Sequence, residues 1–204
     1  MTKEFYKFSK IQDALFHILA GLDFLIIYDC ETTGFKPEEN HIIQLSARLC
    51  CVMENGFLEE VGQAEWYINP GYCLPDNIAE LTGISDDFLR EKPFEVEVFK
   101  EIADFFGREA ILGYNNHKFD DLFLRNMYVR YGCPFEPSVS IDLYKIIKDV
   151  LEPGETENKK LSTVAAYFGF AEDVEQFHNA VSDTKATFFC FNRCLEFYKK
   201  IKSI

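Results

Sequence analysis

The stretch Phe24-Leu-Ile-Ile-Tyr-Asp-Cys-Glu-Thr-Thr-Gly34 decides how this chain folds. An apolar run of strand-like composition leads directly into two carboxylates, Asp29 and Glu31. Alternate residues of a strand point to the same face, so these two side chains project together and Cys30 turns away. Neighbouring carboxylates repel each other and pay a desolvation cost, which is unfavourable unless a cation lies between them. Because the donors are all oxygens, the spacing predicts a bound divalent cation, Mg²⁺ or Mn²⁺.

The composition is that of a folded protein with a sizeable core. The chain has 204 residues, of which 48% are hydrophobic and 16% aromatic, and this length suits one domain. We expect a single domain over residues 1–204, with a helical extension at 1–23 and the core at 24–204. The formal net charge of −13 argues against a protein that grips nucleic acid with a broad basic surface. It leaves open an enzyme whose positive charge comes from bound metal.

The cysteines and the N-terminal sequence predict a cytoplasmic protein. Seven cysteines occur without a C-x-x-C pair, which argues against a zinc site. Their odd number and the absence of a signal peptide predict reduced thiols. The apolar stretch at 15–28 is interrupted by His17, Gly21 and Asp23 and is too short to span a bilayer. We therefore expect no membrane association.

Hydrophobic spacing predicts alternating strands and helices. Ser9-Lys-Ile-Gln12 is a capping box, and the apolar residues after it predict a helix that ends near Gly21 and covers the edge of the domain. We expect strands at 24–30, 42–52, 63–69, 110–114 and 138–141. We expect helices near 75–82, 85–91, 94–106, 118–131, 141–150, 161–168 and 180–200. Strands linked by hairpins, followed by strand–helix alternation, predict a mixed α/β sheet covered by helices.

A third acid follows the fourth expected strand, in Gly113-Tyr-Asn-Asn-His-Lys-Phe-Asp-Asp-Leu-Phe-Leu124. Asp120 lies in the first turn of the next helix, and open α/β sheets build their sites at such carboxyl ends of strands. Asp121 is adjacent but turns about 100° away on a helix. An acid in a first helical turn also simply favours the helix dipole, and for Asp120 alone that is the better interpretation.

The segment His178-Asn-Ala-Val-Ser-Asp183 supplies a histidine and a fourth acid. On one helix these two residues would lie roughly 140° apart. To share a site, His178 must lie on a loop before the helix that carries Asp183. A lone histidine near a helix start is more often solvated, so the prediction of a site rests on all three segments together.

In these segments the chain resembles the DEDDh family of 3′→5′ exonucleases, which includes the epsilon proofreading subunit of bacterial DNA polymerase III. The resemblance covers about residues 24–200 and implies a ribonuclease H-like fold, with a mixed five-stranded sheet flanked by helices and here an extra N-terminal helix. The matching pieces occur in the family order and are Asp29-Cys-Glu-Thr-Thr-Gly34, Ile42-Ile-Gln-Leu-Ser-Ala47, Leu81-Thr-Gly-Ile84, Asn116-His-Lys-Phe-Asp120 with Phe123-Leu124, and His178 with Asp183.

Two departures from the family pattern concern residues beside the acids. Asn115-Asn116 stands where the family commonly has His-Asn, and Ile-Ile-Gln-Leu-Ser, with Gln44 at its centre, replaces the usual Ile-Ile-Glu-Ile-Gly. Because neither departure removes a metal-binding acid of the family, they bear on substrate preference more than on activity.

The resemblance implies that two Mg²⁺ or Mn²⁺ ions are held by Asp29, Glu31, Asp120 and Asp183. Asp29 would bridge the ions, which clamp the attacking and leaving oxygens of an in-line displacement. The resemblance makes His178 the general base, because an imidazole accepts protons near neutral pH. His41 and His117 are the competing candidates for that role.

The family reaction releases 5′-mononucleotides from a 3′ end, so substrate contacts are expected beside the acids. For Phe123, the helical spacing from Phe119 favours a core position instead. The candidate substrate-binding residues are Thr32, Thr33, Leu81, Thr82, Asn116 and Phe123.

DNA is the favoured substrate, as a single-stranded or frayed 3′ end. An exoribonuclease of the same fold and a catalytically inactive binding module are the alternatives. The complete set of four acids with a histidine argues against the inactive module, since a scaffold does not need clustered, repelling charges. A polymerase subunit is a possible partner, although the last expected helix runs almost to Ile204, which favours a free-standing enzyme or a domain of a longer protein.

Overall fold

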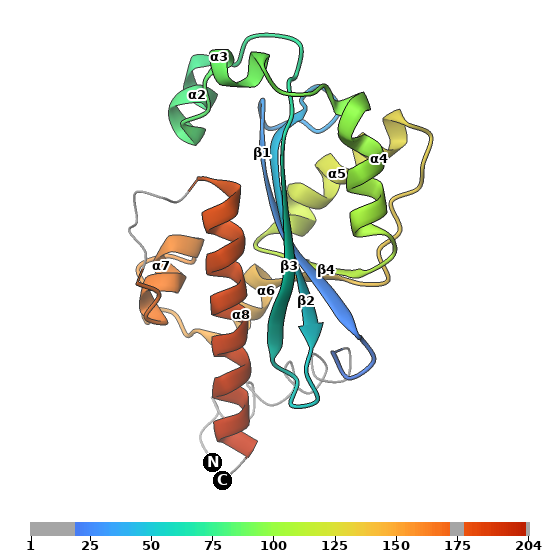
Figure 1. Cartoon of the computed structure of the whole chain (residues 1–204). Coiled ribbons are helices and arrows are strands. Elements are labelled where there is room, and N and C mark those ends of the chain that lie inside the picture. The colour runs from blue at the N-terminus through green and yellow to red at the C-terminus, as the bar shows by residue number, and fades with distance from the viewer. Residues whose placement is uncertain (1–18, 172–177, 203–204) are drawn as a thin grey trace.

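The centre of the molecule is a five-stranded sheet in the order β3-β2-β1-β4-β5 (Figure 1). The computed structural model describes residues 19–171 and 178–202, with side chains as far as Glu196. β1, β2 and β3 pair antiparallel, whereas β4 and β5 run parallel to β1. The mixed sheet is therefore as expected. The strands are β1 Phe24–Thr32, β2 Ile42–Val52, β3 Leu58–Tyr67, β4 Ala110–Gly113 and β5 Ser140–Asp142.

Helices cover both faces of this sheet and one of its ends (Figure 1). On one face, α4 (Glu95–Phe106) and α5 (Asp120–Arg130) pack on Ile26 and Tyr28 of β1. On the opposite face, α6 (Leu143–Val150), α7 (Leu161–Tyr167) and α8 (Ala180–Lys202) pack on Leu25 and Ile27. The short helices α2 (Asp76–Thr82) and α3 (Asp86–Arg90) lie beyond the carboxyl end of β1.

The alternation of apolar residues in β1 explains these two cores. Leu25 and Ile27 point to one helical layer, and Ile26 and Tyr28 to the other, and all four are fully or almost fully buried. A strand buried on both faces is apolar throughout, as the sequence of β1 is up to Tyr28. Asp29 is the first charged residue of the strand, so β1 turns polar where it leaves the packed centre of the sheet.

The end of β1 extends beyond its parallel neighbour. β1 pairs with β4 only from Leu25 to Ile27, and β4 ends at Gly113. A Cβ atom at Gly113 would lie 2.6 Å from the Cβ of Asn116 and 3.2 Å from the carbonyl oxygen of Tyr28, so only glycine permits this close turn. The chain thus leaves the sheet at once and exposes the far edge of β1 to groups from α5.

Two expected elements differ from the structure. β3 begins at Leu58, not at residue 63, because Leu58 pairs with Val52 directly after the Asn55-Gly56 turn. The early part of β3 carries glutamates on an exposed edge, which hide the alternation of a strand. The expected helix at 118–131 is a 3₁₀ turn, η1 (Asn116–Lys118), followed by α5.

The predicted N-terminal helix lies mostly at residues 1–18, outside the described residues. Leu19, which follows them, is buried in the core on the α8 face, and Leu22 packs against the same cluster. Among the described helices, none is both long and apolar enough to cross a membrane.

Candidate active site

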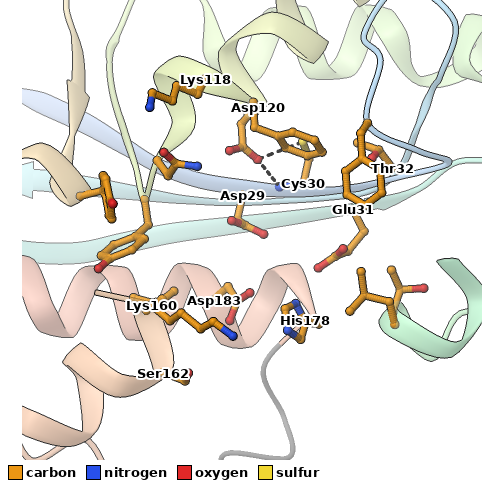
Figure 2. A pocket seen from close by; sticks show the side chains of 18 of the residues that line it. Asp29, Cys30, Glu31, Thr32, Lys118, Asp120, Lys160, Ser162, His178 and Asp183 are labelled. Atoms are coloured by element: carbon orange, nitrogen blue, oxygen red, sulfur yellow. Dashed lines mark hydrogen bonds between the residues drawn. The ribbon is translucent and has the colours of Figure 1, made fainter. Parts of the chain in front are cut away.

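A cavity of about 820 Å³ opens at the carboxyl ends of β1 and β4 (Figure 2). It receives side chains from segments far apart in the sequence, which the sheet and its helices bring to one place. Its titratable lining residues include Asp29, Glu31, Asp120, Asp183, His178, Lys118, Lys159 and Lys160. Its apolar lining residues include Phe35, Ile78, Leu81, Phe119 and Leu161.

Three of the four predicted acids form a tight cluster on the α8 face of the sheet. Asp29 and Glu31 project from β1, and Asp183 meets them from the first turn of α8. One carboxylate oxygen from each of the three lies within 4.8 Å of the others. The strand spacing therefore places the pair on one face as expected, and α8 brings the third carboxylate.

Asp120 approaches the same cavity from the opposite side of β1. The backbone N–H and the thiol of Cys30 each hydrogen-bond its Oδ1, both at 3.1 Å (Figure 2). This backbone N–H is available because β4 no longer pairs with β1 at this point. Cys30 turns away from Asp29 and Glu31, as predicted, and it contacts the fourth acid, a partner that strand alternation alone does not predict.

Burial makes the acids expensive to ionise together. Burial, and then repulsion from Asp120 and Asp183, raises the pKa of Asp29 well above its usual range. Burial followed by the charge of Asp183 raises the pKa of Glu31 to about 8. Burial raises the pKa of Asp183 to about 7 and that of Asp120 to about 6, although hydrogen bonds from His178 and Cys30 respectively oppose these shifts.

These residues fit a divalent cation. The Oδ1 atom of Asp183 is buried and has no hydrogen-bond partner among the described residues, although buried carboxylate oxygens normally have one. The lysines of the lining form no ion pair with the clustered acids. Oxygen donors gathered this closely are the ligand set that Mg²⁺ or Mn²⁺ prefers.

His178 lies two residues before α8, at the edge of the acid cluster (Figure 2). Its backbone has φ 70°, a left-handed conformation that is uncommon outside glycine, and its backbone N–H partly opposes the rise that burial causes in the pKa of Asp183. His178 thus precedes the helix, as the shared site requires. The two competing bases are not lining residues, since His41 stacks edge-on against Tyr72 and His117 bonds the carbonyl of Ser140.

Only some of the predicted substrate contacts lie in the cavity. Thr32, Leu81 and Thr82 line it. The hydroxyl of Thr32 donates to the carbonyl of Gly34 at 2.6 Å, and that of Thr82 donates to the carbonyl of Ile78 at 2.9 Å. Leu81 is 42% exposed and offers an open apolar surface.

Thr33 and Asn116 lie outside the cavity lining, unlike substrate contacts, whereas Phe123 takes the core position that its spacing from Phe119 favoured. Thr33 is buried, and its hydroxyl lies 2.8 Å from that of Tyr72. Asn116 is fully buried and donates to Asp121, and Phe123 is a core residue beneath Phe119. Each of these side chains is used inside the protein and is absent from the cavity lining.

Several lining residues were not predicted from the sequence, among them Phe35, Asn115, Lys118 and Lys160. Phe35 directly follows the motif that ends at Gly34, Lys118 lies within the motif Asn116-His-Lys-Phe-Asp120, and both are exposed. Lys160 comes from a loop between α6 and α7 with no recognisable motif. The pair Lys159-Lys160 in an acidic chain was the available sequence signal for a phosphate contact. Only the folded structure brings this pair opposite β1.

The match to known families agrees with this geometry. A family model described as "Exonuclease", RNase_T, matches residues 26–191. The chain belongs to this exonuclease family. The match confirms the resemblance to the family of 3′→5′ exonucleases that the motifs indicated, the family that includes the epsilon proofreading subunit.

The exonuclease is similar to one part of much longer proteins. It is 33% identical over 162 residues to the DNA polymerase III PolC-type of Pediococcus pentosaceus, which is 79% of this chain and 11% of that protein. It is 32% identical over 181 residues to the PolC-type polymerase of Staphylococcus aureus strain bovine RF122, or 86% and 12% of the two chains. The chain therefore spans about a tenth of the length of these relatives.

Solved structures share the fold of the exonuclease. Escherichia coli exonuclease I in a zinc-bound complex with single-stranded DNA has a TM-score of 0.76 at 21% identity, covering 89% of this chain and 42% of that one. The complex of the same enzyme with a dT13 oligonucleotide gives 0.73 at 20% identity, covering 87% and 42%. The likeness confirms the ribonuclease H-like sheet with flanking helices.

Asp121 is a structural acid next to the site acid Asp120. It is buried and accepts hydrogen bonds from the Tyr28 hydroxyl, from Asn116 Nδ2 at 2.9 Å and from Ser140 Oγ at 2.8 Å. These donors come from β1, η1 and β5. The carboxylate of Asp121 thus fixes the start of α5 against the sheet, on the side away from the cavity.

Alanine at these two adjacent acids is expected to lower stability to very different extents. Asp121→Ala leaves three buried donors without an acceptor and should lower the free energy of unfolding by about 2–4 kcal/mol. Asp120→Ala removes a carboxylate that repels its neighbours and should cost much less. Urea unfolding in EDTA measures both variants, and equal losses would contradict the assignment of Asp121 as the structural member.

Metal should stabilise the exonuclease more strongly at high pH. Since the folded-state pKa values of the four acids are raised, the native state holds more protons than the unfolded state above about pH 4, and stability falls as pH rises towards 8. Mn²⁺ binds the deprotonated groups, so it should raise Tm more at about pH 8 than at about pH 5. Thermal melts with Mn²⁺ or EDTA test this, and Asp29→Asn should reduce the difference. A metal effect independent of both pH and Asp29 would exclude this cluster as the binding site.

Proposed function

We propose that this protein is a metal-dependent 3′→5′ exonuclease that releases 5′-mononucleotides from the end of a DNA strand. The observation that carries the proposal is the convergence of four carboxylates on one cavity with a histidine at its edge. The acids come from β1, α5 and α8. Membership of the exonuclease family gives this convergence its chemical meaning.

The acids would hold two divalent cations. Asp29, Glu31 and Asp183 form the tight cluster for one ion, and Asp120 with Asp29 would serve the other. Bound divalent ions offset the charge of the phosphodiester and lower the pKa of a coordinated water. Asp29 is the natural bridging residue, since repulsion from Asp120, Asp183 and Glu31 all acts on it.

His178 would take the proton from the attacking water. Its side chain is exposed at the start of α8, where solvent and a strand end have access to it. The backbone of His178, and not its ring, acts on the pKa of Asp183, so the imidazole stays available as a base. A base in this position acts on water at the phosphate instead of on a protein nucleophile.

The two ends of the cavity suit the two parts of a nucleotide. Phe35 is 67% exposed and lies beside Phe119, with ring centroids 6.4 Å apart. With Leu81 of α2 they offer aromatic and apolar surface, on which a nucleobase would stack. α2 lies beyond the end of β1 and would block the path of a continuous DNA strand, which favours binding of a DNA end.

Lys118 and Lys160 would bind backbone phosphates beside the acids. Within the described part of the chain, neither ammonium group forms a hydrogen bond or an ion pair, whereas Lys159 Nζ bonds Thr156 Oγ1 at 2.9 Å. Figure 2 shows Lys160 pointing towards Asp183 and His178 from the α7 side. In a chain of net charge −13, these two cations are local phosphate contacts rather than a basic surface.

A single-stranded or frayed DNA 3′ end is the proposed substrate. The solved structures with this fold include complexes with single-stranded DNA, dT13 among them. The similar curated proteins are PolC-type DNA polymerases, so association with a DNA polymerase is the proposed biological setting. These likenesses favour DNA over RNA.

Digestion of end-labelled oligonucleotides tests the function directly. With Mg²⁺ or Mn²⁺, the protein should shorten single-stranded DNA from its 3′ end and release 5′-mononucleotides, and EDTA should stop it. Asp29→Ala should abolish turnover, and His178→Ala should lower kcat about 10²–10⁴-fold without loss of fold. RNA and blunt duplex DNA run in parallel. Undiminished activity of Asp29→Ala in a clean preparation, or cleavage from the 5′ end, would exclude the proposal.

Neutralising Lys160 should weaken substrate binding and its dependence on salt. Lys160→Gln removes one phosphate contact, so KM should rise and the slope of log KM against log salt should fall by roughly 0.7. Lys100→Gln is the matched control, because Lys100 pairs with Asp104 on the exposed side of α4. If both variants show the wild-type slope, Lys160 does not contact phosphate.

A further inference from the structure

Gln44 connects the sheet to the turn that carries His178. It lies on β2, opposite Glu31 in the β1–β2 pairing, and it is fully buried. Its Oε1 accepts a hydrogen bond from the backbone N–H of Ala180 at 3.2 Å. Its Nε2 donates to Glu65 Oε1 at 2.8 Å and to the hydroxyl of Tyr67 at 2.9 Å.

Ala180 needs this partner. It is the first residue of α8 and is fully buried. The first N–H groups of a helix have no partner within the helix, and a buried one has no water either. Gln44 therefore satisfies a donor that would otherwise stay unpaired at the start of α8.

The turn before Ala180 is held from several sides. Asn179 Oδ1 accepts from the N–H of Val181 at 3.1 Å, and the carbonyl oxygen of Asn179 accepts from the N–H of Asp183 at 3.0 Å. A left-handed histidine such as His178 persists where its surroundings fix the backbone this firmly.

We propose that Gln44 is a positioning residue for catalysis: through its hydrogen bond to Ala180 it holds the turn that presents His178 to the acid cluster. This inference rests on the proposed function, in which His178 is the base. Gln44 itself does not line the cavity, so it acts through the backbone of the turn.

The amide of Gln44 is matched to the carboxylate of Glu65. An amide accepts from Ala180 with its oxygen and donates to Glu65 with its nitrogen, whereas a carboxylate can only accept. A glutamate at position 44 would meet Glu65 as a like charge at hydrogen-bond distance. The departure from the family pattern at Gln44 is therefore accounted for by the neighbour on β3, and exchanging the two side chains should preserve the connection.

Other contacts of α8 do not depend on Gln44. Ser46 and Arg48 follow it on the same face of β2, and each lies 3.2 Å from the hydroxyl of Thr184 through Oγ and Nε respectively. Arg48 also donates to the carbonyl of Val181 at 3.4 Å. These bonds should keep α8 docked when residue 44 is changed, so the effect of a substitution is confined to the turn.

A double-mutant cycle tests the proposal with single-stranded oligonucleotide as substrate. Gln44→Glu should lower kcat about 100-fold, the scale of a small misplacement of a catalytic group, while KM changes far less. Glu65→Gln completes the cycle, and the double variant Gln44→Glu/Glu65→Gln should recover most of the lost kcat. Gln63→Glu adds the same charge at an exposed position of β3 and should match wild type. Unchanged kcat in Gln44→Glu, or no recovery in the double variant, would overturn the proposal.

Hydrogen exchange gives a readout that is independent of activity. In Gln44→Leu the amide of Ala180 loses its acceptor and should exchange at least about 10-fold faster, a change that NMR resolves in metal-free protein. If the Ala180 amide of a folded Gln44→Leu variant is as well protected as in the wild type, the proposal is overturned. Thermal melting of the variant shows whether it is folded. If the wild type is inactive, the proposed function is contradicted. If the wild type is active, Asp29→Ala is inactive and Gln44→Glu keeps full activity, only the role of Gln44 is contradicted.

Discussion

Mutual repulsion among four buried carboxylates is the constraint on which the rest of this structure depends. Asp29, Glu31, Asp120 and Asp183 raise one another's cost of ionisation, and burial raises it further. Such groups stay together only if the fold holds them in place, and a bound cation would offset their repulsion. The rigid parts of the molecule can be understood as the means of holding them in place.

Each acid is held by a different device. The pleat of β1 fixes the first pair, and the missing β4 neighbour frees the Cys30 N–H for Asp120. Asp121 anchors the start of α5 through three donors, and polar side chains of β2 dock the start of α8. Polar contacts at these places fix direction and rotation more precisely than apolar packing would.

The fold and the pairing of Asp29 with Glu31 could be predicted from local rules, whereas the gathering of Asp120 and Asp183 at the same site was implied only by the family resemblance. Strand alternation in β1 and the requirement that His178 precede α8 are properties of short segments. Whether a polar side chain is used inside the protein depends on tertiary structure: Asn116 lies within a family motif, yet its amide donates to Asp121 and to Ser140 of β5. The spacing of Phe123 from Phe119, in contrast, already favoured the core position that Phe123 takes. Lys160 was missed because only tertiary structure brings its loop to the acids.

The adjacency of Asp120 and Asp121 has a consequence for reading related sequences. Both positions hold a buried acid, yet one faces the cavity and the other secures the helix. An alignment that slips by one residue here still matches an acid with an acid and scores almost as well. It would transfer the role proposed for Asp120 to the wrong side chain. In relatives with a single acid at this place, the residues at the positions of Ser140 and Tyr28 indicate better which of the two acids remains.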